Sequence, residues 1–276
     1  STGPEHMAAP VKYLVEHSTR PLSVLPNAGL PINVDGEAVY PMLPDPFAHI
    51  LGEFVDWGVN VVGGCCGTTP EHLKKLIEPK SMAIYGISKS NPEHPANIIF
   101  NKNRNHTTAR IYCINPAGGE FRGEKLYRNL KEIGEHVDVA VLAIRSEIIP
   151  AALLECIEAG VSGAIIISGG FSEAGRFDLQ EQIRSIALEH NFPIIGPNGV
   201  GVFSMPFINT FFFPDERFVK PLEGNIGLAS QSGGILVDLM IRFTQEQIGL
   251  SRALSIGNKA VIDEIDALHF FNSDPR

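Results

Sequence analysis

Glycines flank an adjacent cysteine pair in Gly63-Gly64-Cys65-Cys66-Gly67, a stretch that follows an apolar run. Two neighbouring thiolates at the end of a strand can bind one soft metal ion, and glycine lets the backbone turn sharply beside them. A catalytic zinc site normally takes three protein ligands, and the chain offers no obvious third one. Two other interpretations stay open: Cys65 and Cys66 pack as small buried hydrophobic residues, or they form a strained vicinal disulfide.

Small and polar residues follow several apolar runs in the rest of the chain. In an open parallel sheet the ligand binds at such positions, because the carboxyl ends of the strands meet at one edge. Hydroxyl groups and free backbone N–H groups there suit a phosphate. Any one of these residues alone is typical of a helix cap or a turn, and it is the series that predicts a ligand site. The series comprises Gly86, Ser88, Ser90, Asn115, Pro116, Ile144, Ser146, Ser168, Gly169 and Asn198.

The sequence lacks the dinucleotide-binding fingerprint and contains a second candidate phosphate site. The dinucleotide fingerprint G-x-G-x-x-G is missing, because Gly86 is followed by Ile-Ser-Lys-Ser, and this disfavours a nicotinamide dehydrogenase. A further turn precedes an apolar helix pattern over 235–243. Strand, turn and helix in that order predict a phosphate loop at Ser230, Gln231, Ser232 and Gly233.

The elements that must position these residues alternate between strands and helices. Near-continuous β-branched strands with helical crossovers predict an α/β fold, and beyond residue 79 a doubly wound, Rossmann-like parallel sheet. Strand patterns run over 22–25, 59–62, 82–88, 111–114, 137–144, 163–168 and 193–196; helix patterns run over 47–57, 70–77, 150–159 and 178–190.

Length and charge narrow the function classes. The chain has 276 residues, enough for two domains or one large one, and a formal net charge of −9. This charge argues against a nucleic-acid partner, which would need clustered Lys and Arg. No apolar run reaches the about 18 residues that suggest a membrane span. The four cysteines do not suggest a disulfide framework, so we predict a cytoplasmic protein.

The first segment resembles the end of a homocysteine S-methyltransferase domain, a family that includes cobalamin-dependent methionine synthase and the betaine–homocysteine enzyme. The resemblance covers roughly residues 1–78 and rests on Pro26-Asn27-Ala28-Gly29-Leu30-Pro31 and on the run from Gly63 to His72. It implies the last two β/α units of a TIM barrel, with Asn27 binding homocysteine and Cys65 and Cys66 binding zinc. The family's remaining zinc cysteine lies just upstream of the region that resembles Ser1-Thr2-Gly3-Pro4, so the zinc site is expected to be incomplete.

Residues 79–276 resemble NDP-forming acyl-CoA synthetases and the succinyl-CoA synthetase alpha subunit. The resemblance implies that coenzyme A lies across the strand ends. Its phosphates would lie near Ser88 and Ser90, its adenine near Asn115 and Ile144, and its pantetheine arm towards Ser168 and Asn198. The motifs that carry the resemblance are Gly86-Ile87-Ser88, Asn115-Pro116-Ala117-Gly118-Gly119-Glu120, Ser168-Gly169-Gly170-Phe171-Ser172-Glu173, Gly196-Pro197-Asn198, Ser230-Gln231-Ser232-Gly233 and Ser255-Ile256-Gly257-Asn258-Lys259-Ala260.

Two positions depart from that family's pattern. The family often has Lys where Ala117 stands, so Lys89 and Lys125 are the candidates to replace this phosphate contact. Gly199 stands where Cys is usual after Gly-Pro-Asn, which is expected to alter packing more than binding.

The two resemblances together predict three domains: 1–78, 79–215 and 216–276, the last being the start of a truncated flavodoxin-like CoA-ligase domain. In the intact protein an acyl phosphate would pass to CoA through a phosphohistidine in a Gly-His-small-Gly context, which none of the nine His provides. The expected partner is a nucleotide-grasp subunit or domain within an oligomer, and this polypeptide alone is expected to be inactive. Two alternatives stay open: a non-enzymatic CoA- or nucleotide-binding module with a vestigial methyltransferase segment, and a fusion created by an assembly artefact.

Overall fold

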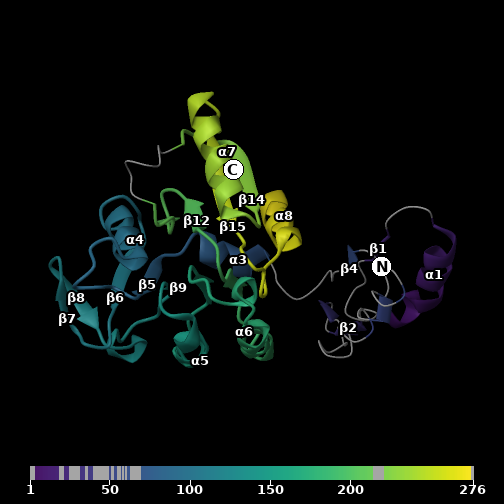
Figure 1. Cartoon of the computed structure of the whole chain (residues 1–276), viewed down its shortest axis with the longest axis horizontal. Coiled ribbons are helices and arrows are strands. Elements are labelled where there is room, and N and C mark those ends of the chain that lie inside the picture. Colours follow the sequence, from purple (N-terminus) through teal and green to yellow (C-terminus); the bar gives the residue numbers. More distant parts are fainter. Residues whose placement is uncertain are drawn as a thin grey trace. The chain divides into compact units, whose positions relative to one another are not determined.

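The computed structural model describes residues 4–18, 22–24, 32–34, 37–39, 50, 53–54, 57, 59, 61–62, 70–213 and 221–274. The chain divides into two compact units, Ser1–Gly67 and Thr68–Arg276 (Figure 1). Asn27, Cys65 and Cys66 lie outside the described residues, as does most of the helix expected over 47–57.

The described part of the first unit contains a parallel strand pair and a long helix. Strand β1 (Ser23–Val24) pairs in parallel with β4 (Val61–Val62), which confirms two of the expected strands. Helix α1 (Pro4–His17) and an antiparallel hairpin of β2 (Ile32–Val34) and β3 (Glu37–Val39) are further elements. The buried apolar residues of this unit include Val11, Val24, Phe54 and Val59.

A seven-stranded sheet forms the centre of the second unit (Figure 1). Its strand order is β11-β10-β9-β5-β6-β8-β7, and neighbouring strands are parallel except for β7 with β8. The order runs outwards from β5 in both directions, which confirms the expected doubly wound sheet. The strands are β5 (Ser81–Tyr85), β6 (Arg110–Ile114), β7 (Gly119–Phe121), β8 (Glu124–Tyr127), β9 (Val139–Leu142), β10 (Gly163–Ile166) and β11 (Ile194–Ile195).

Both faces of this sheet are covered. Along β5, Met82 and Ile84 belong to one hydrophobic cluster, while Ala83 and Tyr85 belong to another on the opposite face. Burial on both faces explains why the strands lack polar alternation. Helices α3 (Pro70–Ile77) and α4 (Pro95–Asn103) contribute to the first cluster, and α5 (Ile149–Glu158) and α6 (Phe177–Glu189) to the second. Short 3-10 helices span Leu130–Glu132, Ser146–Ile148 and Ser172–Ala174.

A four-stranded sheet with the order β13-β12-β15-β14 carries the C-terminal part of the chain. It consists of β12 (Gly201–Ser204), β13 (Ile208–Asn209), β14 (Glu223–Ser230) and β15 (Leu250–Ser255), with α7 (Gly233–Gln245) and α8 (Glu264–Ser273) beside it. Strand β12 pairs with β15, so strands from both sides of residue 215 share this sheet. Leu254, Ile256 and Phe270 also join the hydrophobic cluster of Met82. The segments before and after residue 215 therefore pack together as one body within the second unit.

Helix α3, whose residues lie within the expected segment 1–78, packs against the central sheet. Leu73, Leu76 and Ile77 are at most 1% exposed and lie in the same cluster as Met82 of the central sheet. A Cβ atom added at Gly163 of β10 would lie 2.6 Å from Cδ2 of Leu76, so glycine leaves the room that α3 occupies. The helix thus contributes to the core of the second unit.

A buried ion cluster follows α3. Arg252, only 1% exposed, directs Nη2 to the carboxylate of Glu78 and lies 3.3 Å from Oδ2 of Asp274. A buried charge is tolerated when it is paired in this way. The cluster therefore ties the residue after α3 to β15 and to the end of α8.

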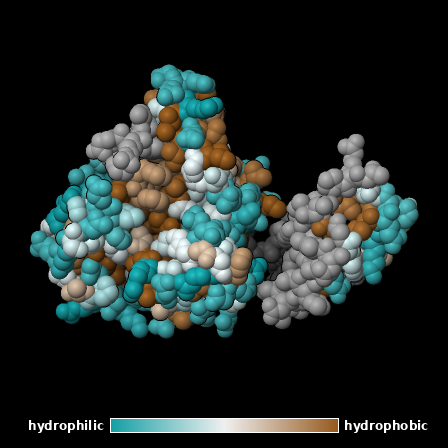
Figure 2. All heavy atoms as spheres, viewed as in Figure 1, coloured by the Kyte–Doolittle hydropathy of each residue, from teal (hydrophilic) through white to brown (hydrophobic). Residues whose placement is uncertain are grey.

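The outer helices expose apolar side chains. Ile235 and Leu239 of α7 and Leu268 of α8 are 36–64% exposed, and Figure 2 shows hydrophobic atoms along α7. Within the described ranges, the helices fall short of the length and apolar character needed to cross a membrane.

Candidate functional site

The first strand of the central sheet ends in a turn that requires glycine. Gly86 follows β5 and has a φ of +99°, in the left-handed region that favours glycine. A Cβ atom there would lie 2.2 Å from the carbonyl oxygen of Ala143, at the end of the neighbouring strand β9. The chain therefore passes close beside β9 before it forms the loop that leads to α4.

Two asparagines hold this loop in place. Asn97 of α4 is fully buried; its Oδ1 accepts from the N–H of Ser88 at 2.9 Å, and its Nδ2 donates to the carbonyls of Ser88 and Asn91 at 2.8 Å each. Asn115, at the end of β6, donates from Nδ2 to the carbonyl of Ile87 at 2.7 Å. The sequence did not predict a role for Asn97, because its only signal was one amide side chain within the apolar pattern of α4.

The loops enclose a cavity of about 660 Å³ at the carboxyl ends of β5, β6 and β9. Small-molecule sites typically occupy about 300–1,000 Å³. Tyr85 and Ile114 supply buried lining, whereas the cationic side chains of Lys89 and Arg128 stand at its exposed side. The sequence-predicted residues that line this cavity are Gly86, Ser88, Ser90, Asn115, Pro116 and Ile144.

The other four predicted residues lie at the ends of β9, β10 and β11. Ser168 accepts a hydrogen bond at Oγ from the N–H of Ile144 at 3.1 Å, and its carbonyl accepts from the N–H of Asn198 at 2.9 Å. A Cβ atom on Gly169 would lie 3.1 Å from Oδ1 of Asn198. Ser168, Gly169 and Asn198 therefore form a strand-end group next to the cavity. Ser146 is buried and accepts from Nη1 of Arg176 at 3.5 Å.

Asn258 joins the strand-end group to the C-terminal sheet. Its Oδ1 accepts from Nδ2 of Asn198 at 3.2 Å, and its Nδ2 donates to Glu173 at 2.5 Å and to Gln180 at 2.9 Å. Burial alone would raise the pKa of Glu173, but the hydrogen bonds from Asn258 and from backbone N–H groups such as that of Gly170 hold this pKa below its usual value. Glu173 therefore stays ionised within this network at neutral pH.

The predicted phosphate loop lies beside the strand-end group. Ser232 caps α7, since its Oγ accepts from the N–H of Ile235 at 3.4 Å, and the hydroxyl of Ser230 donates to the carbonyl of Ser232 at 3.0 Å. A Cβ atom on Gly233 would lie 3.4 Å from Oγ of Ser255. That hydroxyl accepts from the N–H of Val200, two residues after the Gly-Pro-Asn turn, at 3.1 Å. Gln231 is exposed. The phosphate loop and the Gly-Pro-Asn turn thus adjoin the same serine.

The structure distinguishes the two lysines considered as replacements at position 117. Lys89 lines the cavity beside Ala117, and its Nζ donates to the carbonyl of Gly118 at 2.7 Å. Lys125 instead lies over the ring of Tyr127, with Nζ 4.3 Å from the ring centre. Lys89 is therefore the lysine that faces the cavity.

Gly199 is the second departure from the family pattern. A Cβ atom there would lie 2.7 Å from the carbonyl oxygen of Ser255. A cysteine at this position would require the backbone around Ser255 to move away, so the glycine permits a closer approach of the C-terminal sheet.

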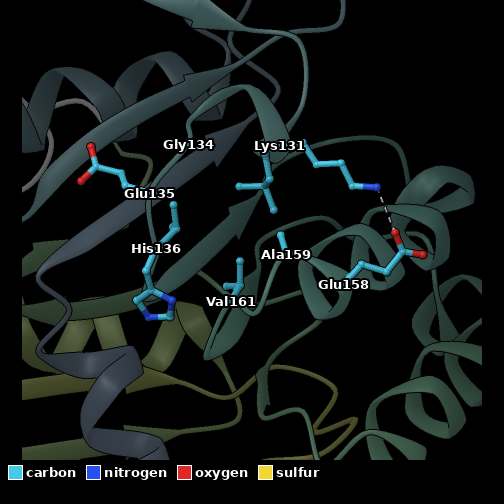
Figure 3. Close-up of a pocket in the computed structure, with 9 residues that line it drawn as sticks. Lys131, Gly134, Glu135, His136, Glu158, Ala159 and Val161 are labelled. Atoms are coloured by element: carbon cyan, nitrogen blue, oxygen red, sulfur yellow. Dashed lines mark hydrogen bonds and ion pairs between the residues drawn. The ribbon is translucent and has the colours of Figure 1, made fainter.

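A second cavity, of about 380 Å³, lies at the opposite ends of the strands, beside the amino ends of β9 and β10 (Figure 3). Its polar groups already have partners: Lys131 Nζ lies 3.4 Å from Oε2 of Glu158, and His136 Nε2 lies 3.3 Å from Oδ1 of Asp138. None of the predicted site residues lines it. The cavity at the ends of β5, β6 and β9 is the candidate site because six of the predicted residues line it.

The part of the chain that the structure describes contains no cluster of three or more potential metal ligands. Cys113 and Cys156 are buried free thiols, and burial raises the pKa of each to about 12, so they stay protonated at neutral pH. They pack as small apolar residues. The predicted zinc and homocysteine residues, Cys65, Cys66 and Asn27, cannot be compared with this result because they lie outside the described residues.

Three protein families match successive parts of the chain. The homocysteine S-methyltransferase family matches residues 1–78, the CoA binding domain matches residues 80–205, and the flavodoxin-like domain of succinyl-CoA ligase matches residues 223–276. Methionine synthase of Mycobacterium tuberculosis is 46% identical over 77 residues, which cover 28% of this chain and 6% of that protein.

The larger part of the chain is similar to ADP-forming acetate–CoA ligases. The enzyme of Methanocaldococcus jannaschii is 38% identical over 204 residues, which cover 73% of this chain and 28% of that protein. The alpha subunit of ligase I of Pyrococcus furiosus is 36% identical over 73% of this chain and 44% of that subunit. The chain thus spans less than half the length of these relatives.

Solved structures agree with this similarity. The dinucleotide-forming acetyl-coenzyme A synthetase 1 of Ca. Korarchaeum cryptofilum, solved with phosphate and ADP, matches with a TM-score of 0.68 and 33% identity, over 74% of this chain and 43% of that chain. Residues 80–205 therefore form a CoA binding domain similar to that of NDP-forming acyl-CoA synthetases, and residues 1–78 form a segment of the homocysteine S-methyltransferase family.

Proposed function

We propose that the cavity at the ends of β5, β6 and β9 binds the nucleotide end of coenzyme A or acyl-CoA. The observation that carries the proposal is the pairing of a buried apolar lining with cationic side chains at the exposed side, within a cavity of about 660 Å³. Apolar lining suits an adenine ring, and cationic and hydroxyl groups suit phosphates. CoA supplies the thiol that accepts the acyl group.

The proposed contacts follow the two groups of strand-end residues. Gly86, Ser88 and Ser90 would hold phosphate groups, and Asn115, Pro116 and Ile144 would lie along the adenosine. Ser146, Ser168, Gly169 and Asn198 would then border the pantetheine arm as it leaves the cavity. This direction is supported by the hydrogen bond between Ser168 Oγ and the N–H of Ile144, which links the two groups.

We further propose that the chain serves a larger acid–thiol ligase. In that reaction a phosphohistidine, in a Gly-His-small-Gly motif that these 276 residues do not contain, would pass its phosphoryl group to the carboxylate of an acid and leave a free histidine. The CoA sulfur, after losing the thiol proton, would then attack the acyl carbon of the acyl phosphate and release inorganic phosphate. The phosphate loop of Ser230, Gln231, Ser232 and Gly233 would receive the phosphorylated histidine at the start of α7. A nucleotide-grasp subunit or domain in a cytoplasmic oligomer would supply the nucleotide, as is supported by the alpha-subunit name of a relative.

Binding of CoA by the full 276-residue chain is the direct test. Titration calorimetry should show saturable binding of CoA and no comparable binding of NAD, because the chain lacks the dinucleotide fingerprint. Acetyl-CoA should bind similarly, since the acyl group lies at the far end of the molecule from the cavity. Tight binding of NAD together with no binding of CoA would contradict the proposal.

For the first segment we propose a partial zinc-dependent homocysteine site, in which Cys65 and Cys66 supply two thiolates and Asn27 contacts homocysteine. The proposal is supported by the 46% identity to methionine synthase over 77 residues. With two thiolates, zinc affinity should be poor, because zinc sites normally use three or four protein ligands. Metal analysis of the purified chain before and after a mild chelator tests this expectation; tight stoichiometric zinc that survives the chelator would contradict it.

A further inference from the structure

Two cationic side chains converge on the loop after β6. Lys89 donates to the carbonyl of Gly118 at 2.7 Å, and Cγ and Nε of Arg128 lie 3.3 Å from the place of a Cβ atom on the same glycine. Gly119 has a φ of +99°, and a Cβ atom there would lie 2.7 Å from Nζ of Lys89. Glycine at 119 thus leaves the space in which the ammonium group sits.

The hydrogen bond to Gly118 positions the charge of Lys89 without neutralising it. A backbone carbonyl is a neutral acceptor, and an ammonium group has three N–H donors, so further donors remain for a ligand. Arg128, by contrast, has the carboxylate of Glu132 at 3.8 Å. Ala117 lines the same cavity and contributes no charge.

The hydroxyl groups beside Lys89 favour an anion rather than a neutral ligand. Ser88 and Ser90 line the cavity on either side of it in sequence, and their Oγ atoms lie 3.5 Å apart. An ammonium group flanked by hydroxyl donors is a common way to bind phosphate. The cavity lining includes one carboxylate, Glu155, and its Oε1 accepts from the N–H of Leu130 at 2.7 Å.

We propose that Lys89 binds a phosphate of the 3′-phospho-ADP portion of CoA, in place of the lysine that the family often carries at position 117. The inference rests on the proposed CoA site and adds to it: the phosphate contact has moved from the loop after β6 to the loop after β5. Lys89 reaches the same place because its ammonium group lies against Gly118, the residue next to Ala117.

The test compares CoA affinity among variants of the full chain. Lys89→Met should weaken CoA binding by about 10- to 100-fold, the range expected for losing a charge-assisted hydrogen bond. Adding Ala117→Lys to Lys89→Met should recover most of that loss. Lys125→Met is the matched control and should change affinity less than about 2-fold, because that lysine lies over Tyr127 outside the cavity lining. Equal thermal midpoints would show that the variants fold alike.

Dephospho-CoA identifies the phosphate. A loss on Lys89→Met that is seen with CoA and absent with dephospho-CoA assigns Lys89 to the 3′-phosphate, and an equal loss with both ligands assigns it to the pyrophosphate. Unchanged CoA affinity in Lys89→Met would overturn the inference while leaving the CoA site intact. A double variant no tighter than Lys89→Met would overturn the claim that positions 89 and 117 serve the same phosphate. Absence of CoA binding in the wild type would instead refute the proposed function.

Discussion

Replacing Leu76 by alanine should destabilise the second unit and leave the first unit unchanged. Leu76 is 0% exposed, and Cδ2 lies close against Gly163 of β10. Truncating a fully buried leucine typically costs about 2–5 kcal/mol, because the lost apolar contact is followed by an unfilled cavity. We take about 3 kcal/mol as the expected change in the free energy of unfolding. In a unit of 209 residues, each kcal/mol lowers the unfolding midpoint by about 2–4 °C, so the midpoint should fall by about 6–12 °C.

The chain offers separate signals for its two units. The single tryptophan, Trp57, lies in the first unit, so its fluorescence reports the unfolding of Ser1–Gly67. Far-UV circular dichroism is dominated by the larger second unit. We expect Leu76→Ala to lower the dichroism midpoint and leave the fluorescence midpoint in place. Lys74→Ala, an exposed change on the same helix, should shift stability by no more than about 0.5 kcal/mol. A shift confined to the Trp57 signal would refute the assignment of α3 to the second unit.

Three other perturbations follow from the geometry. Gly86→Ala should lower both CoA affinity and thermal stability, because its Cβ would meet the carbonyl of Ala143 at 2.2 Å and its φ is +99°; unchanged calorimetry and melting would contradict this. Arg252→Met should cost about 3–5 kcal/mol in a urea unfolding experiment, since it leaves the carboxylate of Glu78 without its buried partner; a neutral result would show that the pair adds nothing. Burial raises the pKa of Asp266 to about 6, so the folded state keeps a proton that the unfolded chain has lost, and stability should fall as pH rises from about 4 to 7. Asp266→Asn should flatten that dependence, and an unchanged pH profile would exclude Asp266 as its source.

Much of the central sheet could be predicted because its strands carry a strong local signal. The β-branched runs over 139–142 and 163–166 are buried on both faces, so their composition alone indicates parallel strands. The short strand Glu124–Tyr127 was missed, since half of its residues are charged and it lies near the sheet edge. Helix α3 shows an apolar face, but such a pattern predicts burial without saying which core the face enters.

The residues of the candidate site could be predicted only where their position directly after a strand fixes their place in the fold. Gly86 and Asn115 follow parallel strands, and strand ends meet at one edge whatever the side chains do. The role of Asn258 could not be found in this way, because its partner Glu173 is 85 residues away in sequence. Asn97 acts through backbone groups of the neighbouring loop, and these carry no residue-specific signal.

The shared C-terminal sheet has a mechanical consequence. Residues 201–203 pair with 253–255, and the N–H groups of Ala260 and Ile262 donate to the carbonyls of Gly196 and Ile194 at 3.0 and 3.1 Å. A hinge between these parts would have to break all of these hydrogen bonds together. The distance between the cavity at the ends of β5, β6 and β9 and the loop before α7 is therefore set by a rigid frame, and no domain closure can bring the two together. In the proposed reaction, a group that moves between them must therefore be carried by a long flexible ligand or by a mobile segment of the protein.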